Sequence, residues 1–299
     1  MKDAGEFPVP ANLAAAVRTE GRRGWLATLP PMLRRLEREW SIQVGAPFEP
    51  GGQTAWVAPA SRRDGADAVV KILWRHPEAE READALRIWE GDGAVRLFAY
   101  EAVDEESIAL LLERCRPGTT LEAWPEPDQD VVIAGLLKRL WREAPTEPAF
   151  ASLQAMCDRW ADEFERNAAT RGGRLPLDAG VAREGISLFR SLPRDARSTV
   201  LLCTDLHAGN VLAAEREPWL AIDPKPVVGD PTYDALQHLL NCDDRLRADP
   251  IGLVHRMAEL LDLDAERLLR WLFARCVQES LDWPGLAAVA ETVARSMST

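Results

Sequence analysis

The chain has 299 residues, of which 46% are hydrophobic and 28% charged, so a disordered or fibrous chain is excluded and one large domain or two lobes are expected. The 48 acidic residues outnumber the 36 basic ones, and the resulting net charge of −12 is unsuited to a nucleic-acid backbone but suits a cationic small molecule. The apolar stretches are too short to span a bilayer and the five cysteines include no C-x-x-C pair, so we expect a cytoplasmic protein without a disulfide framework or a zinc site.

The first third of the chain predicts a small sheet with one inserted helix. An amphipathic helix is expected over Pro30–Trp40, where Leu33, Leu36 and Trp40 recur at helical spacing. Five short segments with alternating or β-branched residues predict antiparallel strands: Ile42–Phe48, Thr54–Pro59, Ala68–Trp74, Val95–Tyr100 and Ile108–Glu113. A helical pattern over Glu78–Glu90 separates the third strand from the fourth.

The remainder of the chain predicts a larger and mainly helical lobe. Seven helical patterns follow one another: Asp128–Glu143, Phe150–Asn167, Asp178–Ser191, Pro231–Asn241, Ile251–Leu261, Ala265–Asp282 and Pro284–Met297. A compact β-like region, Thr199–Val227, interrupts them. We therefore expect an α+β protein with an N-terminal lobe over 1–114 and a C-terminal lobe over 115–299, and a ligand in the cleft between them.

Two short apolar runs in the β-like region carry the chemistry at their ends. Val211–Ala214 and Trp219–Ile222 predict a hairpin with a polar turn. Closing this hairpin brings Asn210 beside Asp223, and Asp205 precedes Asn210 by five positions. Amide and carboxylate oxygens are the ligands that Mg²⁺ prefers. The alternative is that these residues only form local turns, as Asp and Asn before strands often do.

The same residues resemble the catalytic loop and the metal-binding segment of protein-kinase-like small-molecule kinases. The chain is similar to the aminoglycoside phosphotransferases, and most to their streptomycin and hydroxyurea group, in the phrases CTDLHAGN, AIDPKP, GDPTYDALQHLLNC, PFEPGGQTAWVAPA and LLLERCRPGTTL. The resemblance runs from about Leu29 to Trp271. It implies a bilobal protein-kinase-like fold and ATP-dependent phosphorylation of a hydroxyl of an aminoglycoside-type antibiotic, foremost streptomycin, which would confer resistance.

The resemblance also implies roles for single residues. Asp205 would be the base or orienting carboxylate for the attacking hydroxyl, with Asn210 and Asp223 as Mg²⁺ ligands. Cys203 stands where the family commonly has a histidine. Asp234 would steady the backbone of the catalytic loop, whereas a helix N-cap by itself explains Asp230.

Lys71 on the predicted third strand matches the position of the lysine that contacts the α- and β-phosphates in kinase-like folds. The next helix offers Glu78, Glu80 and Glu82 to orient its ammonium group. We favour Glu82, although the spacing permits Glu78 equally well.

Two further segments are expected to contact ATP. Gly51 and Gly52 lie between the first two strands, where backbone N–H groups could cover the phosphates; a glycine pair at such a place is often only a turn. The crossover residues Glu113 and Cys115 would present backbone groups to adenine, so their side-chain identity should matter little.

The acceptor site is the least defined part of the sequence. Guanidinium groups of a streptomycin-like acceptor favour carboxylates. The second lobe offers a pool of helical acids: Asp158, Asp162, Glu163, Glu279 and Asp282. Alternatives to the aminoglycoside kinase are a kinase for hydroxyurea or another small alcohol, an inactive nucleotide-binding module, and a two-metal phosphohydrolase built on Asp205, His207 and Asp223. We expect a monomer that binds a cationic aminocyclitol, and neither nucleic acid nor a membrane.

Overall fold

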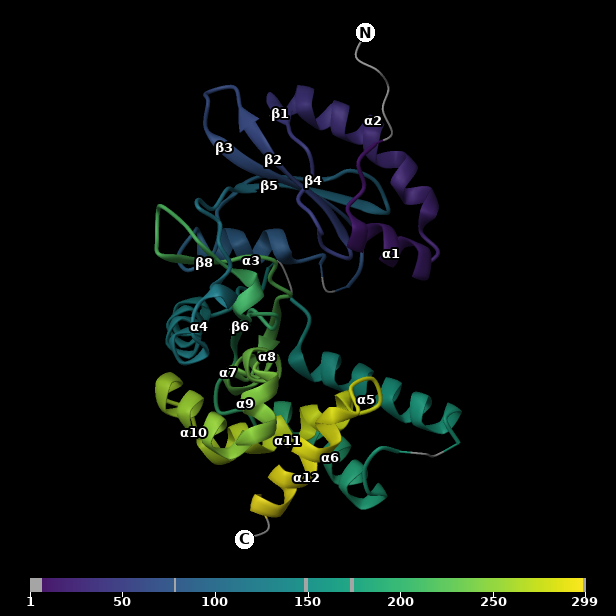
Figure 1. The fold of residues 1–299 in the computed structure, drawn as a ribbon, viewed down its shortest axis with the longest axis vertical. Helices are drawn as coiled ribbons and strands as arrows, with labels where there is room; N and C mark the ends of the chain where they lie inside the picture. Colours follow the sequence, from purple (N-terminus) through teal and green to yellow (C-terminus); the bar gives the residue numbers. More distant parts are fainter. Residues whose placement is uncertain (1–6, 78, 148–149, 173–174, 298–299) are drawn as a thin grey trace. The chain divides into compact units, whose positions relative to one another are not determined.

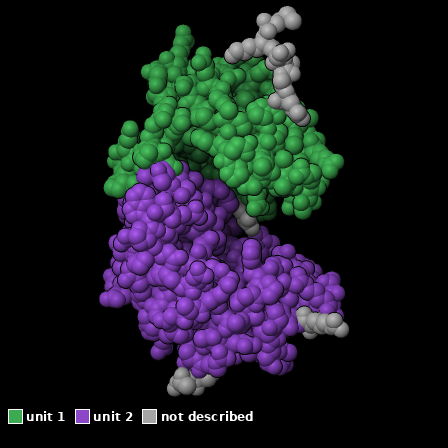
Figure 2. Space-filling view, viewed as in Figure 1, with its two compact units in different colours: residues 1–118, 214–218 green, residues 119–213, 219–299 purple. Residues whose placement is uncertain are grey.

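The structure is a computed structural model that describes residues 7–77, 79–147, 150–172 and 175–297. The chain forms two compact units, shown in Figures 1 and 2. Unit 1 comprises residues 1–118 and 214–218, and unit 2 comprises 119–213 and 219–299. The first division follows Gly118, whereas the sequence placed it after residue 114. The assignment of 214–218 to unit 1 was not predicted.

Unit 1 contains the predicted five-stranded antiparallel sheet, with the strand order β1-β2-β3-β5-β4. Its strands are β1 (Ile42–Val44), β2 (Ala55–Arg62), β3 (Asp67–Trp74), β4 (Leu97–Ala102) and β5 (Ser107–Glu113). Its helices are α1 (Ala11–Thr19), α2 (Arg23–Glu39) and α3 (Glu82–Trp89). Figure 1 shows these helices around the sheet.

The central strand β3 has two faces with different partners. Because side chains alternate along a strand, Val70, Ile72 and Trp74 share one face, and they join α1 and α2 in a common hydrophobic core. Lys71 faces the other side and contacts Glu82 of α3. The alternation therefore separates a core face from a face that carries a buried charge.

The N-terminal helices differ from the expectation. The apolar spacing predicted a helix over Pro30–Trp40, but α2 begins at Arg23 and contains Pro30 and Pro31. An internal proline costs about 3 kcal/mol. Burial of a large apolar side chain stabilises the folded state by about 1.5–3 kcal/mol. Four such residues of α2 are buried: Trp25, Leu29, Met32 and Leu36. Tertiary packing thus outweighs the local signal.

Unit 2 is mainly helical, as predicted. Its helices are α4 (Glu126–Leu140), α5 (Leu153–Thr170), α6 (Ala179–Ser191), α7 (Pro231–Asp234), α8 (Leu236–Asn241), α9 (Asp243–Ala248), α10 (Pro250–Leu261), α11 (Ala265–Glu279) and α12 (Gly285–Met297). Three short 3₁₀ helices accompany them: η1 (Leu121–Ala123), η2 (Leu192–Asp195) and η3 (Ala208–Asn210). The predicted helix Pro231–Asn241 is divided into α7 and α8, and α9 was not predicted.

Several helices of unit 2 begin where a polar side chain caps them. The residue before the helix accepts hydrogen bonds from first-turn N–H groups at five starts: Ser152, Asp178, Asp230, Asp249 and Asp264. Such caps satisfy backbone donors that have no partner within the helix. Helix α11 is buried along much of its length and packs against α6 and α12.

Two small antiparallel ribbons lie among these helices. The first pairs β6 (Val200–Leu202) with β9 (Val227–Gly229). The second pairs β7 (Val211–Ala213) with β8 (Trp219–Ala221) and confirms the predicted hairpin. Within the described ranges, no helix has the length and apolar character that a bilayer crossing needs.

Candidate active site

The β7–β8 hairpin brings Asn210 and Asp223 together at its open end. Val211 pairs with Ala221, and the Ile222 N–H donates to the Asn210 carbonyl at 2.9 Å, which extends the ladder by one residue. Asp223 follows directly and has a φ of 53°, a left-handed conformation that non-glycine residues adopt rarely and often at functional sites. The predicted juxtaposition of the two residues is thus present in the backbone.

Asn210 is also tied to Asp205. Its Nδ2 donates to the Asp205 carbonyl at 2.9 Å and lies 3.4 Å from Asp205 Oδ2. Because the amide nitrogen is used in this way, the amide oxygen is the atom that Asn210 can offer to a cation. These contacts hold Asn210 beside Asp205, and the roles of the two residues in catalysis stay predictions.

Backbone contacts hold the segment of Asp205 against the segment of Asp223. The Lys225 N–H donates to the Cys203 carbonyl at 2.9 Å, and the Thr204 hydroxyl donates to the Lys225 carbonyl. The Lys225 ammonium lies 2.6 Å from Asp223 Oδ1. Two strained residues, Thr204 and Asp223, both with positive φ, flank this junction. The sequence did not single out Lys225, although it lies in the AIDPKP phrase.

Asp234 supports this loop from the protein interior. Its carboxylate accepts hydrogen bonds from the N–H groups of Thr204 at 2.6 Å and Cys203 at 3.0 Å, and from Trp141 Nε1 at 3.0 Å. Burial raises the pKa of Asp234 to about 6, and the three donors act against this rise. The structure thus shows the contact to the loop backbone that the resemblance implied, while Asp230 caps α7.

Burial shifts the pKa of both Cys203 and His207 in the direction that favours the neutral side chain. Cys203 is fully buried, and burial raises the pKa of its thiol well above the usual value. Burial also lowers the pKa of His207, whose Nδ1 accepts a hydrogen bond from the Gly209 N–H at 3.2 Å. Cys203 therefore contributes its backbone to the loop and a packed side chain to the core.

In unit 1, Lys71 and Glu82 form a buried ion pair. The Lys71 ammonium lies 2.8 and 2.6 Å from the two carboxylate oxygens of Glu82, and the two residues are only 7% and 1% exposed. Glu80 is exposed, and Glu78 lies outside the described residues. The structure thus selects the partner that we favoured, while the role of this pair in nucleotide binding stays a prediction.

Glu113 makes side-chain contacts that the sequence did not predict. Its carboxylate accepts hydrogen bonds from Arg216 Nε at 2.8 Å and Nη2 at 2.9 Å, and from the Arg96 N–H at 3.0 Å. Burial alone would raise the pKa of Glu113, but these donors lower it. Arg216, in the β7–β8 turn, also donates to the carbonyls of Gly91 and Ala94. The side chain of Glu113 thus ties β5 to the β7–β8 turn, and the expected contact of its backbone with adenine stays a prediction.

The other residues of unit 1 that were predicted to contact the nucleotide are Gly51, Gly52 and Cys115. Gly51 and Gly52 lie in the segment between β1 and β2, and Gly52 is exposed. Cys115 follows β5 and is buried, and burial raises the pKa of its thiol to about 12. The contact of these residues with ATP stays a prediction.

A second cluster in unit 2 contains ligand types that metals use. Asp130, His238 and Cys242 bring one ligand atom each within 4.8 Å of one another. The Asp130 carboxylate, however, lies 2.8 Å from His238 Nε2, accepts two hydrogen bonds from Arg245 and lies 2.6 Å from Arg256 Nε. Two guanidinium groups already neutralise it and would repel a divalent cation. The cluster therefore ties α4 to α8, α9 and α10.

Comparison with known proteins decides the family. The model of the aminoglycoside/hydroxyurea antibiotic resistance kinases matches residues 40–284. The chain belongs to this family. The kinase is 35% identical to streptomycin 6-kinase of Streptomyces griseus, over 97% of this chain and 96% of that protein. It is 36% identical to hydroxyurea phosphotransferase of Kitasatospora aureofaciens, over 91% of this chain and 79% of that protein.

Solved structures confirm the protein-kinase-like fold of this kinase. A ternary complex of aminoglycoside phosphotransferase APH(4)-Ia with AMP-PNP and hygromycin B has a TM-score of 0.58 at 15% identity, covering 88% of this chain and 97% of that one. Ethanolamine kinase of Plasmodium vivax has a TM-score of 0.56 at 13% identity, covering 86% and 82%. The expectation of a phosphotransferase with an alcohol group as acceptor is confirmed by the family, and the phosphohydrolase alternative finds no support.

Proposed function

We propose that this kinase transfers the γ-phosphoryl group of ATP to a hydroxyl of streptomycin, in the manner of a streptomycin 6-kinase, and so confers resistance. The observation that carries the proposal is the similarity to the Streptomyces griseus enzyme over nearly the full length of both chains. The choice of ATP is supported by the related APH(4)-Ia structure, which holds AMP-PNP together with an aminoglycoside.

Asn210 and Asp223 fit the ligand set of a magnesium ion. Both offer hard oxygen donors, and the hydrogen bond from Asn210 Nδ2 to the loop leaves its amide oxygen as the ligand atom. The carboxylate of Asp223 already attracts one cation, Lys225. When bound, Mg²⁺ would neutralise charge on the transferred phosphoryl group.

The remaining steps fall to side chains of the chain itself. Asp205, held beside Asn210, would orient the attacking hydroxyl and accept its proton. Lys71 would place its ammonium against the α- and β-phosphates, in the orientation that Glu82 fixes. Phosphoryl transfer depends mainly on positioning and charge neutralisation, and these residues provide both.

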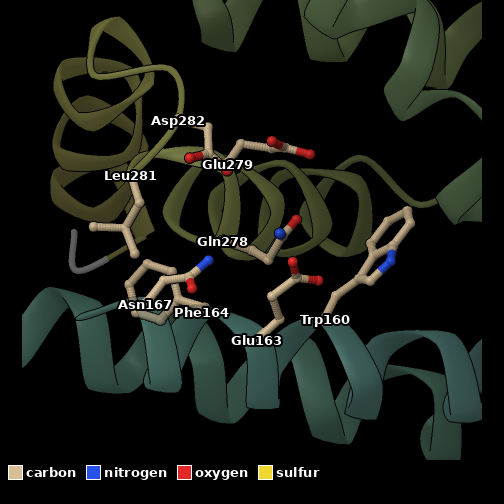
Figure 3. Close-up of a pocket in the computed structure, with 8 residues that line it drawn as sticks. All are labelled: Trp160, Glu163, Phe164, Asn167, Gln278, Glu279, Leu281 and Asp282. Atoms are coloured by element: carbon tan, nitrogen blue, oxygen red, sulfur yellow. The ribbon is translucent and has the colours of Figure 1, made fainter. Parts of the chain in front are cut away.

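An acidic pocket between α5 and α11 supports a guanidinium-bearing acceptor. Its volume is about 190 Å³. Since sites for whole drug-sized ligands measure roughly 300–1,000 Å³, this pocket suits a single cationic group of a larger molecule. Its polar and aromatic lining residues, drawn in Figure 3, are Trp160, Glu163, Phe164, Asn167, Gln278, Glu279 and Asp282.

One wall of this pocket already binds a guanidinium group of the protein. Arg275 lies with its Cζ 4.4 Å from the centre of the Trp160 ring, and its Nη1 is 2.7 Å from Glu279 Oε1. The indole face and the carboxylate are the two partners that a guanidinium group prefers. Glu163 and Asp282 add two further carboxylates to the lining of the pocket.

Glu163 is the carboxylate of this pocket that is left for a ligand. Asp282 is 3.3 Å from Arg171 Nη2, and Glu279 is paired as described above. Within the described part of the chain, Glu163 has no ion pair. Figure 3 shows its carboxylate extending from α5 toward Gln278 of α11. We therefore assign Glu163 to a guanidinium group of the acceptor.

The proposal is tested by steady-state kinetics with ATP and a series of acceptors: streptomycin, an aminocyclitol without guanidinium groups, hydroxyurea and simple amino alcohols. Streptomycin should give the highest kcat/KM, and mass spectrometry and NMR of the product should locate one phosphoryl group on a streptomycin hydroxyl. Glu163→Gln should raise KM for streptomycin about tenfold, because a charge-assisted hydrogen bond is lost. Glu184→Gln, an exposed site on α6, is the matched control. Turnover of hydroxyurea alone would contradict the proposal.

A second candidate, phosphorylation of hydroxyurea, is favoured by the 36% identity to hydroxyurea phosphotransferase. Hydroxyurea is small and uncharged, so it has no use for a guanidinium pocket. In this case Glu163→Gln would leave the kinetics unchanged, and the same acceptor series distinguishes the two candidates.

A further inference from the structure

Helix α1 is joined to the glycine loop, defined here as residues 49–54, by hydrogen bonds from Asn12. The Asn12 backbone N–H donates to the Pro50 carbonyl at 3.0 Å, and Asn12 Nδ2 donates to the Gly51 carbonyl at 2.9 Å. A single residue therefore fixes two consecutive carbonyl groups of the loop.

The glycine loop also lies close to Pro10, the residue that directly precedes α1. Gly51 has a φ of 75°, and a Cβ atom there would lie 2.4 Å from Pro10 Cβ. The Ala11 N–H donates to Glu49 Oε2 at 3.2 Å. Any side chain at Gly51 would therefore separate the loop from the helix or strain the backbone.

Helix α1 is itself fixed to the sheet, so it can serve as a support. Leu13 and Val17 are fully buried in the core that α1 and α2 share with the sheet. Just before the helix, Phe7 stacks on Trp56 of β2, and Trp56 Nε1 donates to the Pro8 carbonyl at 2.9 Å. The loop is thus held by an element with its own buried anchors on both sides of Asn12.

This arrangement determines which way the N–H groups of the loop point. In a trans peptide the C=O and N–H groups are antiparallel. Since the carbonyls of Pro50 and Gly51 point to α1, the N–H groups of Gly51 and Gly52 point away from it. In the part of the chain that the structure describes, neither N–H has a hydrogen-bond partner. Consecutive backbone N–H groups that point the same way favour an anion such as a phosphate.

We propose that α1 is a positioning element for the glycine loop, and that Asn12 holds the N–H groups of Gly51 and Gly52 in place for the phosphates of ATP. This inference rests on the proposed function, since it concerns the nucleotide of that reaction. Asn12 acts through the loop and is a positioning residue, because its own side chain is committed to the Gly51 carbonyl.

The test compares nucleotide binding by calorimetry in the full chain and its variants. Asn12→Ala removes the side-chain donor, and Asn12→Asp keeps its shape but cannot donate to the Gly51 carbonyl. Both should bind ATP and ADP about 2- to 10-fold more weakly, as for the loss of one hydrogen bond, with unchanged affinity for adenosine, which has no phosphate. Asn12→Gln, which restores an amide donor, should recover part of the affinity. Thr19→Ala, at the far end of the same helix, should bind ATP like the wild type.

Kinetics give an independent readout. The Asn12 variants should raise KM for ATP, with kcat at saturating ATP and KM for streptomycin unchanged. Equal weakening of ATP and adenosine binding, or no weakening of either, would overturn the positioning role. If the wild type bound ATP and phosphorylated streptomycin but Asn12→Asp behaved like it, only this inference would fall. If the wild type bound no nucleotide, the proposed function would fall with it.

Discussion

The open end of the β7–β8 hairpin and the Asp130 cluster both gather carboxylates and other potential metal ligands in unit 2. At the hairpin end, the Asp223 side chain is 37% exposed, and the Lys225 ammonium lies 2.6 Å from its Oδ1. In the other cluster, the Asp130 side chain is fully buried and receives hydrogen bonds from two arginines in addition to its contact with His238. By donor atoms alone, the buried cluster with its histidine and cysteine is the more conventional transition-metal site.

The comparison teaches that the charge around a carboxylate decides its use more than the ligand types do. A buried carboxylate that two guanidinium groups neutralise has no favourable interaction left for a divalent cation. A partly exposed carboxylate that contacts an ammonium group can exchange this contact for one with a metal ion. We therefore assign chemistry to the hairpin end and stability to the Asp130 cluster.

The largest expected effect concerns the hairpin end. Asp205→Ala should lower kcat for streptomycin phosphorylation by about 10²–10⁴-fold, because the group that orients the hydroxyl and accepts its proton is lost. ATP affinity, measured by calorimetry, should change little, since the side chain acts on the acceptor. Asp244→Ala, an exposed carboxylate on α9, is the control. A variant at Asp205 with normal turnover would remove this residue from the reaction.

Asp130→Asn should affect stability instead of chemistry. Breaking a buried ion pair costs about 3–5 kcal/mol, so chemical denaturation should show a loss of this size. The folded fraction should keep its kcat and its KM for ATP. A large fall in kcat at full folding would place the cluster in the reaction and contradict the comparison.

The stability loss in Asp130→Asn should also depend on pH. Burial would raise the pKa of Asp130, but hydrogen bonds from His238, Arg245 and Arg256 outweigh it and hold the pKa well below the ordinary 3.8. The stability that this carboxylate contributes is therefore present above that value and is lost as the pH falls below it. Denaturation of both proteins between about pH 7 and pH 3 should show the difference shrinking toward acid. A constant difference would contradict the ion-pair explanation.

A smaller effect is expected for Glu113→Gln in unit 1. The variant keeps one oxygen acceptor but loses the charge that pairs with Arg216, so unfolding free energy should fall by about 1–3 kcal/mol. Arg216 retains its bonds to the carbonyls of Gly91 and Ala94, which limits the loss. Glu105→Gln, in the exposed β4–β5 turn, is the control. If Glu113→Gln lost as much unfolding free energy as Asp130→Asn, the partly exposed Glu113–Arg216 pair would be as strong as the buried pairs of Asp130, which would contradict the expectation.

Local patterns in the sequence predicted the sheet, the helical second unit and the hairpin. The hairpin could be predicted because its two apolar runs and its polar turn are contiguous in the sequence. Pairing the two runs then places Asn210, which precedes the first, beside Asp223, which follows the second. Glu82 was favoured among the acids of the helix that follows the strand of Lys71, although the spacing alone permitted Glu78 as well. These inferences need only periodicities over short distances in the chain.

The features that were missed depend on contacts between distant segments. Nothing local reveals that Trp25 and Leu29 join the core on the sheet, so the predicted helix began only at Pro30 whereas α2 begins at Arg23. The Glu113–Arg216 pair joins residues 103 positions apart, and the bond from Asn12 to Gly51 spans 39 positions. A polar turn and an exposed asparagine carry no sequence signal of such partners.

The most direct test of the central claim is the Mg²⁺ dependence of ATP binding, titrated by calorimetry in the wild type, Asp223→Asn and Asp130→Asn. Asp223→Asn should raise the Mg²⁺ concentration for half-maximal ATP binding by at least about tenfold, since even indirect supports of a metal ligand have effects of that size. Asp130→Asn should leave it unchanged. An unchanged Mg²⁺ requirement in Asp223→Asn, or a raised one in Asp130→Asn, would contradict the assignment of the cation to the hairpin end.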